Sequence, residues 1–392
     1  MQFILSDGPE WNSLLPLTFT RPTAEIRIGI LTLREKWEHL LKKKTHTITQ
    51  AHLTEKYTSP SEKKLNICIN PTFLPTEDLI QAIQELKENQ ALIKKGKCIA
   101  FCRDSQKKNY TIPLKEIPYQ KALIHIEYPW DIFRHNAKAL EQDFKLLTRN
   151  RTSAPLSKSN HITGENIFIE EETIVEYATL NAQNSPIYIA KKAQIMEGCL
   201  IHGGLALCEG AVLNMGTKIY GATTIGPYCK IGGEIKNSVF FAYSNKAHDG
   251  FLGNSVLGEW CNLGAGTNAS NLKNNYSKVD VWSYVTDQTI PTGLQFCGLL
   301  MGDHSKSAIN TQFNTGTVVG VSTNVFGYGF PPKHIPSFSW GGIQENKIFD
   351  FDKACKTAQI MMSRRGESFG PSDREILRHL FDLTQKKNNT TS

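Results

Sequence analysis

Aliphatic residues recur at every sixth position through the middle of this chain. Eight of them follow one another without a miss: Ile189, Ile195, Ile201, Leu207, Leu213, Ile219, Ile225 and Ile231. An amphipathic helix places apolar residues three and four apart, and a half-buried strand places them two apart. A step of six matches neither, but it is the repeat of a parallel β-helix, in which each hexapeptide supplies one short strand and one turn. The spacing therefore predicts a β-helical solenoid.

A second position of the repeat, four residues after each aliphatic one, is mostly small. Its occupants are Ala193, Cys199, Leu205, Ala211, Thr217, Thr223, Cys229 and Ile235. A narrow coil has room for one bulky side chain on each face, so its other inward position must usually be small. The six-residue repeat continues in other registers before and after this segment, at Ile162, Phe168, Ile174, Leu180, Phe251, Leu257, Leu263, Met301, Ser307, Phe313, Val319 and Val325. We expect the solenoid to occupy residues 151–335.

Residues 1–150 have a different pattern, which is typical of an α/β domain. Expected strands cover 2–5, 66–69 and 99–102, and expected helices cover 30–41, 77–89 and 132–147. Thr76 is a suitable N-cap for the second of these helices. A linker rich in Ser, Thr and Asn at 149–160 leads into the solenoid.

The tail, residues 336–392, is expected to be helical. Pro331, Pro332 and Pro336 should end the β pattern. Helix is then expected at 349–362, and Ser372 with Glu375 forms a capping box before another apolar stripe. Because a solenoid needs its open end covered, capping is the default role for this tail.

Composition excludes several classes of protein. No apolar run approaches the ~20 residues that span a bilayer, and the first residues lack the basic and apolar segments of a signal peptide. The nine cysteines form no CxxC pair, and several fall at small interior positions, so they predict buried free thiols in a reducing cytoplasm. The net charge of +7 is mild. No aromatic-plus-basic cluster of the RNA-binding kind is present, so neither nucleic acid nor membrane is an expected partner.

The repeat is interrupted after Ile231. Asn237 takes the next aliphatic slot, and two unusual segments follow, one containing His248 and one rich in glycine at 260–267. Three hexapeptides make about one coil, so residues ~18 apart stack at the strand spacing of ~4.8 Å. We therefore expect His248 to lie one coil below Gly266 and Thr267, with Asn262 in the same neighbourhood.

These segments resemble the acetyltransferase half of the GlmU family, bifunctional enzymes that make UDP-N-acetylglucosamine. The resemblance rests on Ser244-x-x-x-His248, on Leu252-Gly253, on the run from Asn262 to Thr267 and on a later asparagine. It is closer still to a divergent, Bacteroidetes-type branch described as sugar nucleotidyltransferases, and it extends over nearly the whole chain through residues 14–22, 28–37, 220–227, 248–260 and 302–306. It implies a left-handed parallel β-helix behind a nucleotidyltransferase-like domain, a cytoplasmic homotrimer, and sugar phosphate, nucleotide and acetyl-CoA as small-molecule substrates.

The resemblance also implies roles for individual residues. His248 matches the general base that takes a proton from the glucosamine amine, a task that suits an imidazole near neutral pH. Asn271 matches the residue that orients this amine. Expected substrate contacts come from Lys218, Lys236, Asn262 and Phe251, the last at a position where the family usually has tyrosine, and expected acetyl-CoA contacts come from Ala265, Gly266 and Thr267.

Plainer interpretations stand beside these roles. A lone histidine is more often a hydrogen-bonded structural residue than a base. Asparagines in solenoids often form only turn ladders, and most lysines are simply solvated.

The N-terminal domain departs from the nucleotidyltransferase pattern. Such enzymes cradle nucleotide phosphates in a glycine-rich loop after the first strand, but residues 5–10 offer only Gly8. Asp7, Arg21, Arg27 and Lys36 are the candidate nucleotide-binding residues, and Asp7 could support Mg²⁺. They could equally be relics or surface charges, which leaves uridylyl transfer open.

Three other functions can be weighed from the residues alone. The chain could be a sugar-1-phosphate nucleotidyltransferase whose solenoid only assembles the trimer. It could be a non-catalytic regulator that binds sugar nucleotides. A zinc hydratase on a similar solenoid needs three close histidines, whereas His202, His248 and His304 are spread too widely for that spacing, so no metal is expected there.

Overall fold

The computed structural model describes residues 2–57, 65–104 and 114–391. Its N-terminal part contains a mixed six-stranded sheet in the order β4-β1-β5-β7-β6-β8. The strands are β1 (Gln2–Ser6), β4 (His46–Ile48), β5 (Leu65–Ile69), β6 (Gln90–Lys94), β7 (Lys97–Asp104) and β8 (Lys115–Pro118). The surrounding elements are α1 (Glu10–Ser13), η1 (Thr23–Glu25), the hairpin β2 (Arg27–Ile28) and β3 (Leu31–Thr32), α2 (Leu33–Leu41), η2 (Ala51–Leu53) and α3 (Glu77–Gln84).

Two predicted helices of this part are shorter than expected. The helix predicted for 30–41 begins at Leu33, because Thr32 belongs to β3 and forms a capping box with Glu35. The helix predicted for 77–89 does begin after Thr76, whose side chain accepts the Leu79 amide. It ends at Gln84 because the chain soon turns into β6, with the left-handed φ of +61° at Asn89.

The predicted parallel β-helix is confirmed, and it consists of three sheets whose strands stack in parallel coil upon coil, except for the last strand of the second sheet, which pairs antiparallel. The first sheet contains β10 (Ile167–Ile169), β13 (Ile187–Ile189), β16 (Leu205–Leu207), β19 (Thr223–Ile225), β22 (Val239–Phe240), β25 (Val256–Leu257), β30 (Leu300–Met301), β33 (Val318–Val319) and β35 (His334–Ile335). The second contains β11 (Ile174–Val175), β14 (Gln194–Ile195), β17 (Val212–Leu213), β20 (Lys230–Ile231), β23 (Asn245–Lys246), β26 (Asn262–Leu263), β31 (Lys306–Ser307), β34 (Asn324–Phe326), β36 (Ser339–Gly342) and β37 (Asn346–Ile348). The third contains β9 (His161–Thr163), β12 (Thr179–Asn181), β15 (Leu200–His202), β18 (Lys218–Tyr220), β21 (Glu234–Lys236), β24 (Phe251–Gly253), β27 (Asn268–Ala269) and β32 (Gln312–Phe313).

The hexapeptide positions form the solenoid core. The eight aliphatic residues that recur from Ile189 to Ile231 are each no more than 2% exposed. Residues 18 apart pair directly, as Ile201 does with Ile219. One bulky and one small side chain per hexapeptide thus fill the interior, as the sequence predicts.

The C-terminal end differs from the prediction. Prolines 331, 332 and 336 do not end the β pattern, because β35 pairs in parallel with β33 and β36 with β34. The expected helices do follow, as α5 (Phe351–Ser363) and α6 (Pro371–Thr391). The predicted capping box of Ser372 and Glu375 is wrong, since α6 begins at Pro371, which puts Ser372 inside the helix, and the carboxylate of Asp373 accepts the amide of Gly370.

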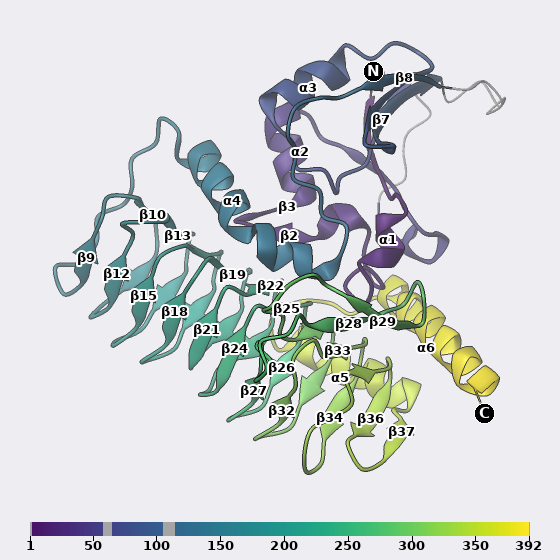
Figure 1. Ribbon diagram of the computed structural model, residues 1–392. Helices are drawn as coiled ribbons and strands as arrows, with labels where there is room; N and C mark the ends of the chain where they lie inside the picture. Colours follow the sequence, from purple (N-terminus) through teal and green to yellow (C-terminus); the bar gives the residue numbers. More distant parts are fainter. Residues whose placement is uncertain (1, 58–64, 105–113, 392) are drawn as a thin grey trace.

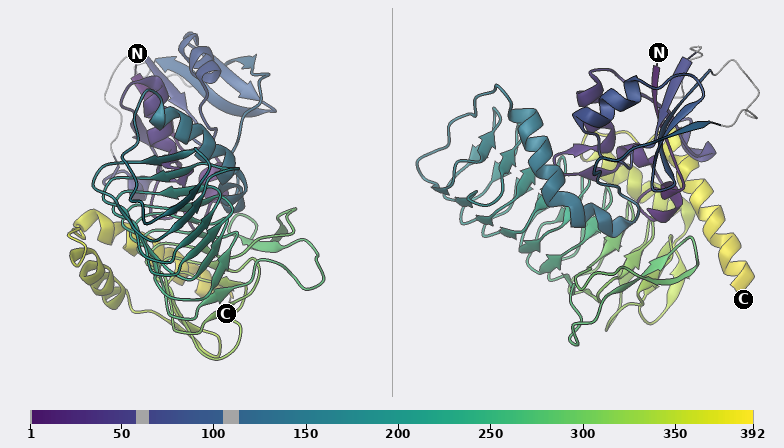
Figure 2. Two further views of the ribbon diagram at one scale, coloured as in Figure 1. Left: turned by 90° about the vertical axis from the view of Figure 1, so that its left-hand side faces the viewer. Right: turned by 45° about the horizontal axis from the view of Figure 1, so that its top comes forward.

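Helix α4 (Pro129–Thr148) links the two β-rich parts and lies along the outer face of the first solenoid sheet (Figure 1). The Asn136 amide donates to the carbonyl of Ala222 at 2.8 Å and accepts the Gly29 amide at 2.7 Å. The excursion after Asn271 forms the hairpin β28 (Asp280–Ser283) and β29 (Gln288–Pro291). Seen along the solenoid, this hairpin and the C-terminal helices project on opposite sides (Figure 2).

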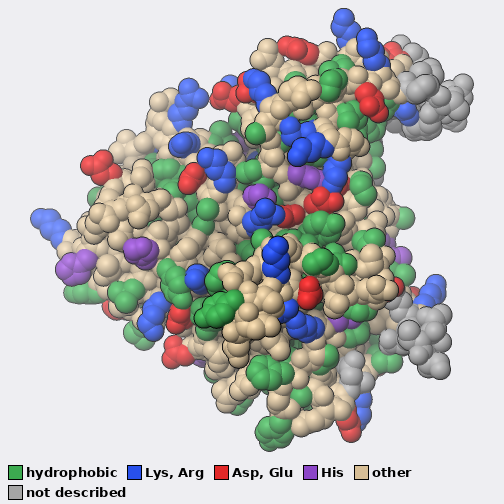
Figure 3. All heavy atoms as spheres, viewed as in Figure 1, with side chains coloured by type: hydrophobic (Ala, Val, Ile, Leu, Met, Phe, Trp, Pro, Cys, Tyr) green, Lys and Arg blue, Asp and Glu red, His purple; other side chains and the backbone are tan. Residues whose placement is uncertain are grey.

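The described surface is mixed in charge. On the face shown in Figure 3, Lys and Arg side chains alternate with Asp, Glu and uncharged ones, without one continuous basic area over the described residues. Across the described ranges, no helix combines the length and apolar character needed to cross a membrane. All nine cysteines are free thiols, and eight of them are buried.

Candidate functional site

His248 lies in the turn that joins β23 of the second solenoid sheet to β24 of the third, and its side chain is exposed. Three contacts hold this turn, here defined as residues 247–250. The side-chain amide of Asn214 donates to the Ala247 carbonyl at 2.8 Å, and the Lys246 ammonium donates to the His248 carbonyl at 2.7 Å. The amide of Gly266 donates to the carbonyl of residue 249 at 3.1 Å. The imidazole therefore projects from a fixed corner of the solenoid.

The turn needs a glycine directly after this corner. Gly250 has a φ of +122°, in the region that other residues rarely adopt. A Cβ atom added there would lie 2.1 Å from the carbonyl oxygen of Thr267. Close stacking on the next coil thus brings the His248 turn against the glycine-rich segment, as the 18-residue spacing predicts.

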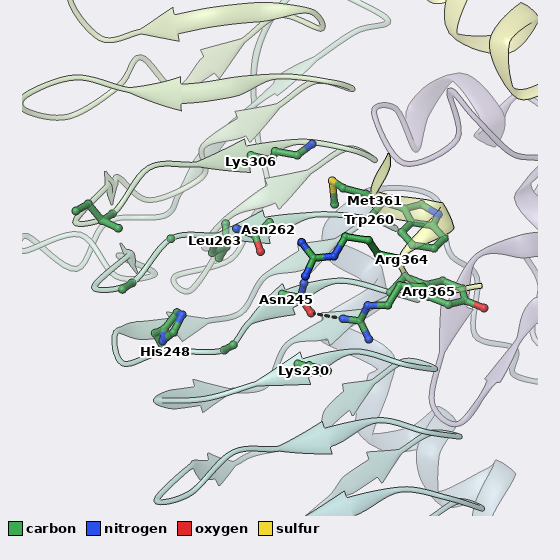
Figure 4. A pocket seen from close by; sticks show the side chains of 15 residues that line it. Lys230, Asn245, His248, Trp260, Asn262, Leu263, Lys306, Met361, Arg364 and Arg365 are labelled. Atoms are coloured by element: carbon green, nitrogen blue, oxygen red, sulfur yellow. Dashed lines mark hydrogen bonds between the residues drawn. The ribbon is translucent and has the colours of Figure 1, made fainter. Parts of the chain in front are cut away.

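His248 sits at one end of a cavity of about 800 Å³ on the second sheet (Figure 4). The C-terminal end of α5 forms the opposite wall, and Arg364 and Arg365 reach from it towards the strands. The described lining consists of Lys230, Tyr243, Asn245, Ala247, His248, Trp260, Asn262, Leu263, Gly264, Ala265, Lys306, Ile309, Met361, Arg364 and Arg365. Four of these residues are Lys or Arg and none is Asp or Glu. The cavity therefore suits an anion.

Two of the cations are fixed by polar contacts. The guanidinium of Arg365 donates to the Asn245 side-chain oxygen at 3.0 Å. The Lys306 ammonium donates to the carbonyl of His304 at 2.8 Å, and burial lowers the pKa of Lys306 to about 8. A phosphate entering the cavity would favour the charged form of this lysine.

The structure places Asn262 and Ala265 in the cavity with His248, but Thr267 needs a correction. Its side chain is only 1% exposed and points into the solenoid core. The hydroxyl lies 3.0 Å from that of Ser307 and 3.3 Å from the carbonyl oxygen of Ala308. It cannot contact a ligand in the cavity. Gly266 flanks the lining without belonging to it and has a φ of +68°.

The other predicted substrate residues lie on the opposite side of the His248 corner, on or beside the third sheet. Lys218 is exposed there, and Phe251 stands two coils further along the same row. The Lys236 ammonium lies over the rings of Tyr220 and Phe296, at 5.6 and 5.5 Å from their centroids. These side chains form a second surface next to His248 and do not line the cavity.

Asn271 begins the excursion after β27 and is 8% exposed. Its side-chain amide donates to the side-chain oxygen of Asn254 at 2.8 Å. This contact fixes one end of the amide near the third sheet, beside Gly253. The structure thus puts Asn271 on the same side of His248 as Lys236.

Three of the four predicted nucleotide-binding residues need correction, because their cationic groups face other parts of the fold. Arg21 is buried and pairs with Asp303 and Glu259 of the solenoid. Lys36 is buried and pairs with Asp143 of α4. The guanidinium of Arg27 donates to the carbonyl of residue 30 and lies 3.9 Å from the Cys208 sulfur. These residues hold the N-terminal domain to the rest of the chain and are not placed to bind a nucleotide.

Asp7 does line a separate cavity of about 260 Å³ between β1, β5 and β7. Its carboxylate already accepts the Thr23 amide at 2.8 Å and the hydroxyls of Thr23 and Thr49 at 2.6 and 2.5 Å. Burial raises the pKa of Asp7. In the described parts of the chain no group of three or more His, Cys, Asp or Glu side chains is arranged to hold a metal ion. Both oxygens of the Asp7 carboxylate are already engaged by protein donors.

Several lining residues carry no recognisable signal of a binding role in the sequence. Lys230 and Lys306 occupy outward positions of the second sheet, which the hexapeptide repeat leaves undefined. Arg364 and Arg365 lie more than 100 residues after His248, and only the folded position of α5 brings them to it. The one local signal is the pair of arginines at the end of an amphipathic helix, just before Gly366.

Comparison with known proteins gives matches to both parts of the chain. Residues 3–152 match the family model described as sugar nucleotidyl transferase. A bifunctional sugar-1-phosphate nucleotidylyltransferase/acetyltransferase of Sulfurisphaera tokodaii is 25% identical over 215 residues, which cover 54% of this chain and 47% of that protein. The bifunctional protein GlmU of Synechococcus elongatus is 26% identical over 184 residues, covering 44% and 36%.

A shorter match is stronger in identity. The bifunctional protein GlmU of Rippkaea orientalis is 49% identical over 57 residues, 14% of this chain and 13% of that protein. Among solved structures, an Arabidopsis UDP-N-acetylglucosamine acyltransferase aligns with a TM-score of 0.23 and 14% identity, over 54% of this chain and 80% of that one. The chain spans less than half the length of the curated relatives that it matches. Residues 3–152 are thus similar to sugar nucleotidyl transferases, and about half of the chain is similar, at low identity, to bifunctional GlmU-type proteins.

Proposed function

We propose that this chain is a transferase of GlmU type, whose solenoid moves an acetyl group from acetyl-CoA to the amine of glucosamine-1-phosphate. One observation carries the proposal. The exposed imidazole of His248 stands at the end of an 800 Å³ cavity whose described lining has four cations and no carboxylate. Such a cavity suits a long, phosphate-bearing acyl donor, and the relative from Sulfurisphaera tokodaii is named a bifunctional sugar-1-phosphate nucleotidylyltransferase/acetyltransferase.

The chemistry needs one base and one oriented pair of reactants. The sugar amine attacks the carbonyl carbon of the thioester, so that a C–N bond forms and the C–S bond breaks. His248 accepts the proton that the amine loses, and this proton can pass to the departing thiolate. The corner position of His248 fits this role, because the acyl donor would approach from the second sheet and the amino sugar from the third.

The residues on the third sheet would then hold the sugar phosphate. Lys218 and Lys236 supply positive charge, and Asn271 has its amide fixed near the same surface. Phe251 provides an apolar wall between them. The resemblance to the GlmU family implies a homotrimer, and a neighbouring subunit that closes this side of His248 belongs to the proposal. The buried free thiols suit a cytoplasmic protein.

The first test measures CoA release from acetyl-CoA with a thiol reagent, with and without glucosamine-1-phosphate. We expect release that depends on the sugar. His248→Ala should lower kcat by about 10²–10⁴-fold, the usual contribution of a general base. His202→Ala removes another exposed histidine, from β15 of the third sheet, and should leave the rate unchanged. Full activity in His248→Ala would exclude His248 as the base.

The cavity itself is tested with Arg364→Ala. We expect the KM for acetyl-CoA to rise about tenfold, the effect of losing one charge-assisted hydrogen bond, with a smaller change in the KM for the sugar. Lys356→Ala is a matched control, because Lys356 is an exposed cation on the same helix α5 that does not line the cavity. An equal rise in both variants would mean that only the overall charge of α5 matters.

Uridylyl transfer by the N-terminal domain is the second candidate function, favoured by the family match over residues 3–152. Against it stand the single glycine in the first loop and the inward pairing of Arg21 and Lys36. Pyrophosphate release from UTP and a sugar-1-phosphate, measured on the same sample as CoA release, separates the two. CoA release without pyrophosphate would leave acetyl transfer as the one activity.

A further inference from the structure

Lys246 breaks the apolar stack inside the solenoid. Its place in the second sheet is an inward one, paired with Ile231 on the preceding coil, and Leu263 follows on the next coil. The side chain is 1% exposed and ranks among the largest fully buried side chains of the chain. An aliphatic residue here would continue the row without cost. A lysine buried in this row lowers the stability of the fold, since a buried charge loses its hydration.

The ammonium of Lys246 contacts the backbone on both sides of the interruption. It donates to the Gly232 carbonyl at 3.1 Å and to the His248 carbonyl at 2.7 Å. Burial lowers the pKa of Lys246 to about 8, and Asp249 opposes this shift. The lysine thus ties the turn that carries His248 to the coil beneath it, at the expense of its own solvation.

The contact from Lys246 completes the set of hydrogen bonds that hold residues 247–250. Asn214 holds the carbonyl of residue 247 and the Gly266 amide holds the carbonyl of residue 249, while the Lys246 ammonium holds the His248 carbonyl between them. Without the ammonium, the peptide group that follows His248 would lose its contact with the interior, and the imidazole would sample more orientations.

We propose that Lys246 is a positioning residue, which fixes the His248 backbone so that the imidazole stays directed at the reacting amine. This inference rests on the proposed acetyl transfer for its functional consequence, but its structural part can be measured without any activity. A positioning role would explain why a charged residue occupies a core position that normally excludes charge.

The test compares Lys246→Met with wild type in two measurements. The first is hydrogen–deuterium exchange of peptides that cover residues 247–251, where we expect at least tenfold faster exchange in the variant. The second is steady-state acetyl transfer, where we expect kcat to fall at least tenfold while both KM values stay within about twofold. Methionine fits an apolar stack of this width, so the midpoint of thermal unfolding should stay the same or rise.

Ile195→Met is the matched control, because Ile195 lies in the same interior row three coils earlier, and it neither lines the cavity nor contacts the His248 carbonyl. It should leave both exchange and kcat within about twofold. Lys246→Gln, which keeps a neutral N–H donor, should recover part of the exchange protection and part of kcat. It also serves as the second variant if Lys246→Met does not fold.

The outcomes separate the two proposals. Unchanged exchange at 247–251 in Lys246→Met overturns the positioning role, whatever the activity. Faster exchange with unchanged kcat, in a wild type that does release CoA, overturns its link to catalysis. A wild type that releases no CoA counts against the proposed acetyl transfer, while the exchange measurement still decides whether Lys246 holds the turn.

Discussion

The ion pair between Arg21 and Asp303 is a direct test of how the N-terminal domain is attached to the solenoid. The two side chains are 3% and 4% exposed. Arg21 also lies 3.0 Å from the carboxylate of Glu259 and over the ring of Phe241, at 5.1 Å from its centroid. Arg21→Met keeps most of the apolar stem but leaves the Asp303 carboxylate buried without its cation.

The expected cost follows from what remains around Asp303. Removing one member of a buried pair costs about 3–5 kcal/mol. Asp303 would still accept the Thr20 hydroxyl at 2.6 Å and the amide of Glu259 at 2.8 Å. These two donors stabilise the remaining carboxylate, so we expect the lower end of the range, about 3 kcal/mol. Arg21→Met combined with Asp303→Leu should cost less than the sum of the single changes, since no charge is then left unpaired.

Urea unfolding followed by tryptophan fluorescence measures these free energies. The control is Arg134→Met, because Arg134 is 53% exposed and its ion pair with Asp131, at 3.7 Å, should contribute less than about 1 kcal/mol. If Arg21→Met lowers the free energy of unfolding no more than this control does, the ion pair does not attach the N-terminal domain to the solenoid. If the free-energy losses of the two single variants add up to the loss in the double variant, Arg21 and Asp303 stabilise the fold independently.

Three further outcomes follow from buried polar groups. Lys36→Met should cost about 3 kcal/mol in urea unfolding, because Asp143 would stay buried with only backbone donors. Lys246 binds its proton less tightly when folded than when unfolded, so its penalty is complete below about pH 8 and disappears as the pH rises towards its ordinary value of 10.5. The stability gained in Lys246→Met should therefore shrink by about 3 kcal/mol between pH 7 and 10.5, as parallel urea titrations would show. Thr267→Val should cost about 1 kcal/mol for its lost hydrogen bonds but leave the KM for acetyl-CoA within twofold; a larger rise in KM would contradict its interior position.

The solenoid could be predicted because its signal is local and repeated. The inward positions of each hexapeptide can be identified from that hexapeptide alone, and Ile201 stacks on Ile219 as the spacing requires. The same spacing of about one coil per three hexapeptides predicted that His248 and the segment containing Asn262 and Ala265 lie close together. The ends of elements were less predictable, since prolines at 331, 332 and 336 fit between short strands of a solenoid where they would end a helix or a central strand.

The roles of cations could not be predicted in the same way, because they depend on partners distant in sequence. Lys36 finds its carboxylate 107 residues away and Arg21 finds its own 282 residues away. A basic residue in a nucleotidyltransferase-like domain invites a phosphate-binding role until its partner is known. Only the fold shows that these two charges are already neutralised.

The distribution of paired and unpaired charge then separates the two candidate activities. Arg21 and Lys36 of the N-terminal domain are buried against Asp303 and Asp143, so a phosphate would have to compete there with a carboxylate already in place. Around His248 the described lining offers Lys230, Arg364 and other cations without any acidic residue. A phosphate-bearing ligand gains most where positive charge has no internal partner. The solenoid cavity, and not the family-matched domain, is therefore the place where we expect this chain to bind its anionic acyl donor.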